Sequence, residues 1–221
     1  MKSPRGQVRA VCLISTGLDS PVAAYLTVRS GVVPVLLSFA HDEADSGTGG
    51  RLERMIRKVE ESTRAGSLVT YIVPHRDVLQ EIVARAPQRL TCVLCRRMML
   101  RVASRIARLE DASFIVTGEI LGEHASQTLE NIFAENSASR GMPIVRPLIG
   151  MNKLEVEEIA RKIGTYQIAA ERSTVCPYVP ERPRTAARVE EVAAAEASLG
   201  VEEVVERCLR AARKSVIQNT A

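Results

Sequence analysis

The chain has 221 residues, of which 46% are hydrophobic and 25% are charged, a balance typical of a globular protein with a full core. No uninterrupted apolar stretch approaches the length of a membrane span, and no signal-peptide core follows residues 1–5, so we expect a cytoplasmic protein with no membrane partner. A formal net charge of +4 at pH 7 tolerates a polyanion but does not by itself indicate a nucleic-acid-binding protein.

Four apolar, β-branched runs predict strands, and an amphipathic helical pattern accompanies each of them. The strands are expected at 8–14, 32–39, 68–73 and 113–117, and the helices at 21–29, 51–63, 77–86 and 96–109. Near-continuous apolar strands that alternate with helices indicate an α/β fold with a parallel sheet covered on both faces. Ligands of such sheets bind beyond the carboxyl ends of the strands.

The pattern changes after Gly164. Residues 174–184 contain three prolines and a cysteine and are expected to be irregular, and 189–213 is typical of one or two alanine-rich helices that break near Gly200. We therefore expect an α/β domain over residues 1–185 and a helical C-terminal extension over residues 186–221. A polar, glycine-rich segment at 41–50 is expected to form a mobile loop at the ligand-binding edge of the sheet.

A turn of small residues follows the first predicted strand and leads directly into a helix. A helix start offers unpaired N–H groups and a partial positive charge, Gly17 lets the backbone approach an anion closely, and Pro21 suits a first helical turn. Ser15 and Ser20 add hydroxyls, and Asp19 is a candidate ligand for Mg²⁺. No lysine follows, so this is not the loop of the P-loop NTPases. The turn predicts a phosphate site, and the alternative is an ordinary Ser/Gly turn before an amphipathic helix.

Five cysteines in a chain expected in the cytoplasm favour metal or redox chemistry over a disulfide framework. Cys92 and Cys95 are spaced to bind one metal centre, and Cys176 is the best candidate for a third ligand. Three cysteines favour an iron–sulfur cluster with one open iron, or a dithiol or persulfide site, over a structural zinc with four ligands. Zinc remains the alternative if His75 or His124 supplies a fourth ligand. The other two cysteines lie in a strand and a helix pattern and are interpreted as small buried hydrophobes: Cys12 and Cys208.

A polar run at 118–132 follows the fourth predicted strand. Gly118 permits close backbone approach there, and Ser126, Gln127 and Thr128 supply polar groups at the start of a helix. These residues predict a second ligand-contacting segment at the same sheet edge. The alternative is a capped amphipathic helix with no ligand.

Four motifs, at 15–26, 92–99, 118–132 and 146–153, resemble the tRNA 4-thiouridine synthetase (tRNA sulfurtransferase) family in its own order, over roughly residues 8–185. The first motif resembles the pyrophosphate-binding loop of PP-loop ATP pyrophosphatases, which split ATP into AMP and pyrophosphate to adenylate a substrate. The cysteine pair with a distant third resembles the archaeal branch, which uses a three-cysteine iron–sulfur cluster. Bacterial members instead use a cysteine pair and a rhodanese domain.

The resemblance implies a PP-loop ATP pyrophosphatase domain, of the adenine nucleotide alpha hydrolase-like type, over residues 1–185. It implies Cys92, Cys95 and Cys176 as ligands of the cluster, whose open iron would carry the sulfide that is transferred. Cys176 also stands at the position of a catalytic cysteine of the bacterial branch, and with Asp19 it is a candidate catalytic residue. The loop residues and those implied by the resemblance make up the candidate ATP contacts: Leu13, Ile14, Ser15, Gly17, Ser20, Ser38, Phe39, Arg96, Gly118 and Gln127.

The sequence departs from the family pattern at two places. Thr16 stands where the family loop usually has glycine, and a β-branched residue tolerates positive φ poorly. The family's ferredoxin-like and THUMP regions, which grip tRNA, precede its catalytic sheet, whereas residue 8 already lies in a predicted strand. With no tryptophan and only three phenylalanines, the chain has few aromatic rings for stacking on RNA bases. We therefore expect tRNA to be bound with help from a separate THUMP-type RNA-binding protein or from a second copy of the chain.

The expected reaction is ATP-dependent thiolation of a tRNA uridine to 4-thiouridine, at position 8 by resemblance. The carbonyl oxygen is adenylated, pyrophosphate leaves with help from Mg²⁺ and the loop N–H groups, and sulfur then displaces AMP. One alternative is another PP-loop ligase, such as a different tRNA thiolase or a deazaguanine-forming ligase with a structural zinc. The other is a non-catalytic ATP- or cluster-binding subunit of a sulfur-transfer complex.

Overall fold

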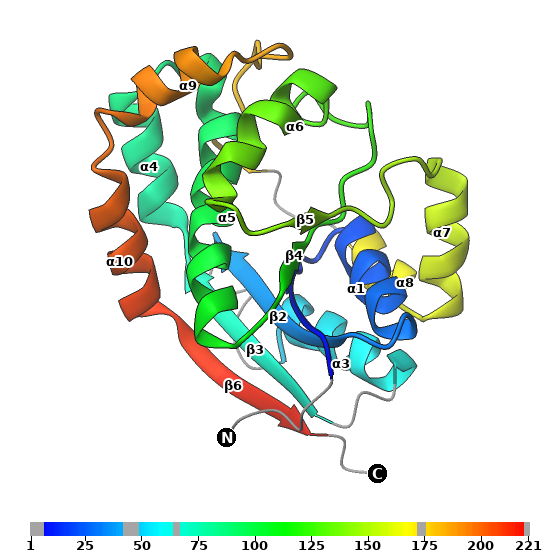
Figure 1. The fold of residues 1–221 in the computed structure, drawn as a ribbon. Coiled ribbons are helices and arrows are strands. Elements are labelled where there is room, and N and C mark those ends of the chain that lie inside the picture. The colour runs from blue at the N-terminus through cyan, green and yellow to red at the C-terminus, as the bar shows by residue number, and fades with distance from the viewer. Residues whose placement is uncertain (1–6, 42–48, 64–66, 172–175, 219–221) are drawn as a thin grey trace.

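The structure is a computed structural model that describes residues 7–41, 49–63, 67–171 and 176–218. At its centre is a six-stranded sheet in the order β5-β4-β1-β2-β3-β6 (Figure 1). Strands β1 to β5 pair in parallel, and β6 pairs antiparallel with β3. The bounds of the strands are β1 Arg9–Leu13, β2 Val33–Ala40, β3 Ser67–Pro74, β4 Phe114–Val116, β5 Ile144–Val145 and β6 Arg213–Gln218. The expected α/β fold is confirmed.

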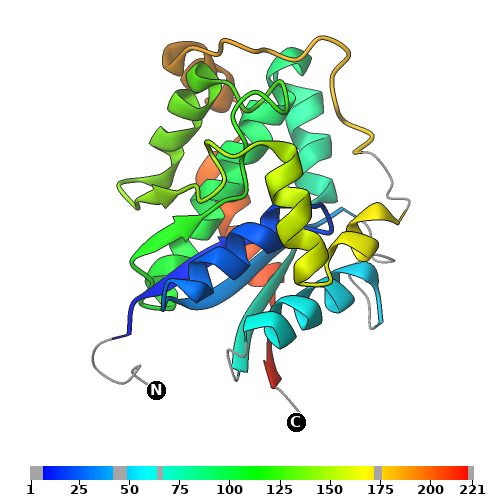
Figure 2. The same ribbon diagram turned by 90° about the vertical axis from the view of Figure 1, so that its right-hand side faces the viewer.

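Helices cover both faces of the sheet, and Figure 2 shows one of these two layers in front of the strands. The layer in front contains α1 (Asp19–Arg29), α3 (Arg51–Thr63), α7 (Lys153–Lys162) and α8 (Tyr166–Ala170). The opposite layer contains α4 (Arg76–Arg85), α5 (Thr91–Leu109) and α10 (Val201–Ala211), with α6 (Leu129–Asn136) and α9 (Val189–Glu196) packed on α5, and the 3-10 turns Gln88–Leu90 and Ser137–Ser139. No described helix combines the length and apolar character that crossing a membrane requires.

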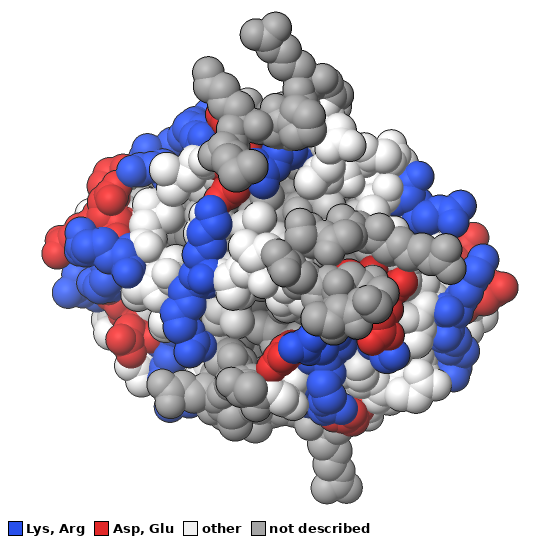
Figure 3. Space-filling view, turned by 90° about the horizontal axis from the view of Figure 1, so that it is seen from below, with Lys and Arg blue, Asp and Glu red and all other residues white. Residues whose placement is uncertain are grey.

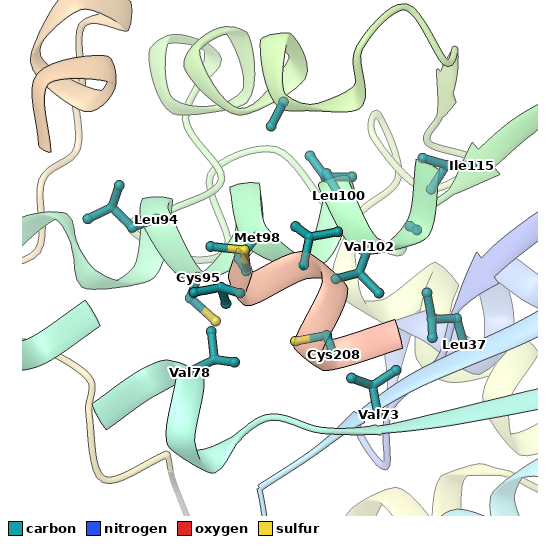
Figure 4. Close-up of a cluster of buried hydrophobic side chains, with 14 of the residues drawn as sticks. Leu37, Val73, Val78, Leu94, Cys95, Met98, Leu100, Val102, Ile115 and Cys208 are labelled. Atoms are coloured by element: carbon teal, nitrogen blue, oxygen red, sulfur yellow. The ribbon is translucent and has the colours of Figure 1, made fainter. Parts of the chain in front are cut away.

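Two hydrophobic cores lie on the two faces of the sheet because successive strand residues point to opposite sides. In β1, Val11 enters the core under α5, whereas Cys12 enters the core under α1. Figure 4 shows Cys95 and Cys208 among aliphatic side chains of the core under α5. Cys12 and Cys208 are both buried, as expected of small apolar residues.

The strand order reverses between β1 and β4, and this reversal places the site. From β1 the chain moves outward to β2 and β3, and later returns to β4 and β5 on the other side of β1. The connections therefore leave β1 and β4 in opposite directions and open a crevice beyond their carboxyl ends. The loop after β1 and the polar run after β4 face each other there.

The C-terminal segment returns to the sheet. A helical extension was expected over 186–221, and the strand within it was not predicted. Its helices α9 and α10 lie where helices were predicted, but Arg213–Gln218 forms the edge strand β6. Lys214 Nζ lies 2.6 Å from Glu110 Oε1, and the Tyr71 hydroxyl of β3 donates to the same oxygen at 2.5 Å. A polar, charged strand is suited to a sheet edge, and its sequence lacks the apolar run by which buried strands are recognised.

Candidate functional site

A cavity of about 560 Å³ opens at the carboxyl ends of β1, β2 and β4, a size suited to a nucleotide. Its walls are formed by the loop after β1, the ends of β2 and β4, and the segment around Cys176. All ten candidate ATP contacts and both candidate catalytic residues line it, whereas Cys92 and Cys95 do not. These candidate residues therefore share one cavity, and their individual roles stay predictions. The glycine-rich loop expected at 41–50 lies mostly at 42–48, outside the described residues.

Two serines fold the loop after β1 back on itself. The Ser15 N–H donates to Ser20 Oγ at 2.8 Å, and the two hydroxyl oxygens are 2.9 Å apart. The Gly17 N–H in turn donates to Ser15 Oγ at 3.2 Å. Helix α1 then begins at Asp19, and its cap residue Leu18 makes no side-chain hydrogen bond to the first turn. The first N–H groups of α1 are therefore left for an anion in the cavity.

Gly118 lets the end of β4 approach the start of α1. A Cβ atom at this position would lie 2.8 Å from both Cα and N of Ser20 and 3.0 Å from the carbonyl carbon of Asp19. These are backbone atoms that cannot rotate away, so only glycine fits. The close approach predicted for Gly118 is therefore made to the helix start that faces the cavity.

The back of the loop is held by Arg51, which the sequence analysis did not identify. Its side chain is 8% exposed, and Nη2 lies 3.3 Å from the carbonyl oxygens of Thr16 and Ile168. Thr16 is not among the residues with positive φ, so the strain expected of a β-branched residue there does not arise. Arg51 stands at the start of a predicted helix with no pattern around it, and only the folded chain brings it to the loop.

Asp19 is the carboxylate of the loop, and burial raises the pKa of its side chain while His124 and Lys153 lower it. Mg²⁺ in nucleotide sites is usually held by one or two carboxylates together with phosphate oxygens and water. One carboxylate beside a phosphate-binding turn fits that requirement. Asp19 therefore stays the predicted ligand of Mg²⁺.

The three candidate cluster ligands are neighbours but do not form a finished metal site. Cys92 and Cys95 lie near the start of α5, where burial raises the pKa of both thiols and nearby Cys176 raises it further. Within the described part of the chain, no three His, Cys, Asp or Glu side chains are grouped closely enough to hold a metal ion. Three thiols are suitable ligands for a soft metal or an iron–sulfur cluster. Because the three are not grouped closely enough here, the cluster stays a prediction.

The two histidines considered as a fourth ligand lie in different places. His75 is fully buried, and its Nε2 lies 3.2 Å from Cys95 Sγ. His124 instead lines the cavity and acts electrostatically on Asp19. Of the two, His75 is therefore the neighbour of the thiols.

A network of buried charges borders the cavity, and of its members only Arg96 is among the candidate site residues predicted from the sequence. Arg96 contacts Glu119 through Nη2, and its Nε lies 3.3 Å from Glu135 Oε2. Arg146 contacts Glu119 from the other side. Burial raises the pKa of Glu135 to about 7, although Arg96 and Arg146 oppose this shift. The sequence signal that was available is the position of Glu119, directly after Gly118 at a strand end.

Comparison with known proteins gives the site its context. Residues 6–201 match the family model described as "Thiamine biosynthesis protein (ThiI)". The chain is 37% identical over 190 residues to the "Probable tRNA sulfurtransferase" of Methanocaldococcus jannaschii, covering 84% of this chain and 48% of the relative. It is 40% identical over 212 residues to the protein of the same name from Thermus thermophilus, covering 91% and 50%. The chain thus spans about half the length of these curated relatives.

Two solved structures share the fold. The "Crystal structure of a 4-thiouridine synthetase - RNA complex with bound ATP" superposes with a TM-score of 0.89 at 29% identity and covers 96% of this chain and 55% of that one. The NMN synthetase of Francisella tularensis matches with a TM-score of 0.53 at 12% identity over 92% of this chain and 77% of that one, a likeness of fold alone. The family model, the relatives and the ATP-bound structure agree with one another, and the chain belongs to the ThiI family.

Proposed function

We propose that this chain is the catalytic part of a tRNA sulfurtransferase, which adenylates a tRNA uridine with ATP and replaces its oxygen with sulfur to give 4-thiouridine. The observation that carries the proposal is a single cavity with the phosphate-binding turn and Asp19 on one wall and Cys176 on another. A nucleotide on the turn and a sulfur nucleophile at Cys176 would then meet across one acceptor base. The ATP-bound relative supports the nucleotide part of the proposal.

In the first step, the uridine carbonyl oxygen attacks the α-phosphorus of ATP. An O–P bond forms, the bond to pyrophosphate breaks with its electron pair leaving on pyrophosphate, and the ring N3–H proton is released. The open N–H groups at the start of α1 stabilise this developing charge, because they point at the anion before the reaction begins. When bound at Asp19, Mg²⁺ would neutralise part of the same charge.

In the second step, a sulfur nucleophile at the oxidation level of hydrosulfide attacks the activated ring carbon. A C–S bond forms, the C–O bond breaks with its electron pair leaving on AMP, and the S–H proton moves to ring N3 to give the thione. We place this nucleophile at Cys176, the thiol of the three that lines the cavity. A cluster held by Cys92, Cys95 and Cys176 would supply an open iron that carries the sulfide.

Recognition of tRNA is the part of the proposal that needs help from outside the catalytic sheet. A net charge of +4 is modest, and on the face shown in Figure 3 the basic and acidic side chains are intermixed. Mixed charge favours weak, salt-dependent contacts with phosphates over a strong basic surface. We propose that a THUMP-type RNA-binding protein, or a second copy of the chain, raises the affinity for tRNA.

The proposal is tested with protein purified under anaerobic conditions. Iron, sulfide and zinc are measured, and pyrophosphate release and thiolated tRNA are followed with and without a THUMP-bearing partner. We expect ATP-dependent pyrophosphate release, thiolated tRNA, and bound iron and sulfide. In Cys176→Ser, the thiolated tRNA and the bound iron and sulfide should both be lost. Stoichiometric zinc with His75 as a ligand would instead favour a zinc-bearing PP-loop ligase. ATP binding without pyrophosphate release under every condition would favour a non-catalytic subunit.

A further inference from the structure

Two carboxylates border a cavity proposed for a polyanion. Glu119 is 1% exposed and lines the cavity, and Glu135 is fully buried beside it. A buried carboxylate is destabilising unless it is paired, and near a nucleotide it also repels phosphate. Their presence therefore needs a compensating role, which lies in the two arginines that they bind.

Arg96 is held at two of its three nitrogens. Nε lies 3.3 Å from Glu135 Oε2, and Nη2 contacts Glu119. Among the residues that the structure describes, Nη1 makes no hydrogen bond to the protein. The Arg96 side chain is 26% exposed and lines the cavity, so the free edge of its guanidinium is available to a ligand there.

Glu119 is itself fixed from behind. The Thr117 hydroxyl donates to its Oε2 at 2.6 Å, and Arg146 contacts the same oxygen. Arg146 also donates to Asn136 Oδ1 at 2.8 Å, which anchors it to the end of α6. The Glu119 side chain is therefore fixed in one orientation, and its contact with Arg96 fixes the orientation of the Arg96 guanidinium.

Arg96 also stands where the two halves of the proposed site meet. It directly follows Cys95 on α5, and it shares the cavity wall with Cys176. A phosphate bound by Arg96 would lie in the part of the cavity that Cys176 also lines. AMP is the second leaving group of the proposed reaction. It carries one phosphate, which needs a positively charged partner in the cavity as AMP leaves.

We infer that Glu119 and Glu135 are positioning residues that hold Arg96 with its free edge toward the cavity, so that it binds the phosphate of AMP as AMP leaves. The inference rests on the proposed function for the identity of the leaving group. Glu119 and Glu135 offset part of the positive charge of Arg96 and Arg146, so charge alone does not explain the network. Its contribution is orientation: a long side chain fixed before the ligand arrives loses less conformational entropy on binding.

The test is a double-mutant cycle on AMP binding to the purified full chain, measured by calorimetry. We expect Arg96→Ala, which removes the binding group, to raise the dissociation constant of AMP about tenfold. Glu119→Gln, which removes the partner that orients Arg96, should raise it by about the same factor. Because Glu119 acts through Arg96, the double variant should bind AMP no more weakly than Arg96→Ala alone.

A matched control exists on the same helix. Arg97 pairs with Glu196 at 2.7 Å, and these side chains are 4% and 7% exposed, but neither lines the cavity. Glu196→Gln should therefore lower the melting temperature and leave the dissociation constant of AMP unchanged. If Glu119→Gln does not fold, Glu135→Gln takes its place in the cycle with the same expectation.

Three outcomes would overturn the inference: AMP binding by Glu119→Gln equal to that of the unmodified chain, losses in the double variant that multiply, and an equal loss of binding in Glu196→Gln. AMP binding needs neither tRNA nor a sulfur donor. An intact cycle in a protein that never thiolates tRNA would therefore contradict the proposed function and support the inference.

Discussion

The closest backbone approach in the site gives a sharp prediction: Gly118→Ala should damage ATP binding more than it damages the fold. The added Cβ would meet the backbone of Ser20 at 2.8 Å, whereas ordinary contact begins at 3.4 Å, so the start of α1 would have to retreat by about 0.6 Å. Forcing an extra carbon into such a contact typically costs about 1–3 kcal/mol. In a chain of this size that corresponds to a loss of about 2–12 °C in melting temperature.

The effect on the nucleotide should be larger, because the atoms that move are the N–H groups proposed to bind phosphate. A misplacement of about 1 Å can lower the rate of a positioned reaction about 10²-fold. We expect pyrophosphate release to fall by about that factor, measured together with ATP affinity by calorimetry and with thermal unfolding. Gly150→Ala is the matched control, since its added Cβ would meet nothing within 4 Å. Equal behaviour of the two variants would refute the assignment of this helix start to the phosphates.

Other variants probe the same cavity from different sides. Asp19→Asn should lower pyrophosphate release by about 10²-fold at an unchanged melting temperature, and normal release would remove Asp19 from the mechanism. Burial raises the pKa of Glu135 from 4.5 to about 7. Between these values the folded protein keeps a proton that the unfolded chain has released, so the free energy of unfolding should fall as pH rises. Glu135→Gln should remove at most about 3 kcal/mol of that fall. The free energy of unfolding is measured in urea at about pH 5 and about pH 7.5. An equal change between these pH values in the variant and the unmodified chain would contradict the prediction. Cys176→Ala should abolish thiolated tRNA while ATP still binds, whereas Cys208→Ala should keep the activity and lose about 1 kcal/mol of stability. Thr16→Gly should leave the affinity for ATP within about twofold, because Thr16 does not have positive φ, and a tenfold change would contradict that reading.

Features that depend on short, continuous stretches of sequence could be predicted from the sequence alone. The predicted helix at 51–63 matches α3, and each of the four predicted strands overlaps an observed one, because strands buried on both faces have near-continuous apolar runs. The turn proposed to bind phosphate could be predicted for a similar reason, since its candidate residues are consecutive in the sequence. A resemblance over most of the chain then related distant segments to one cavity.

Features that depend on contacts between distant residues were missed. The short strand β5 and the polar strand β6 have no apolar run, and only their partners β4 and β3 make them strands. Arg51 reaches the loop across 35 residues of sequence, and Arg96 reaches Glu135 across 39. A charge that is buried by tertiary contacts looks, in the sequence, like any charge on the surface of a helix.

The pairing of β6 with β3 has a consequence for how the chain acquires its fold during synthesis. Residues 67–72 of β3 pair with 213–218 of β6, so one side of β3 has no neighbour until residues 213–218 have left the ribosome. An open strand edge is a template for pairing with other chains, and contacts that close so late slow folding. Nascent chains arrested before residue 213 has emerged should therefore aggregate or be cleaved by protease far more readily than chains in which residues 213–218 have emerged. Equal protease resistance would show that the sheet is stable before its last strand arrives.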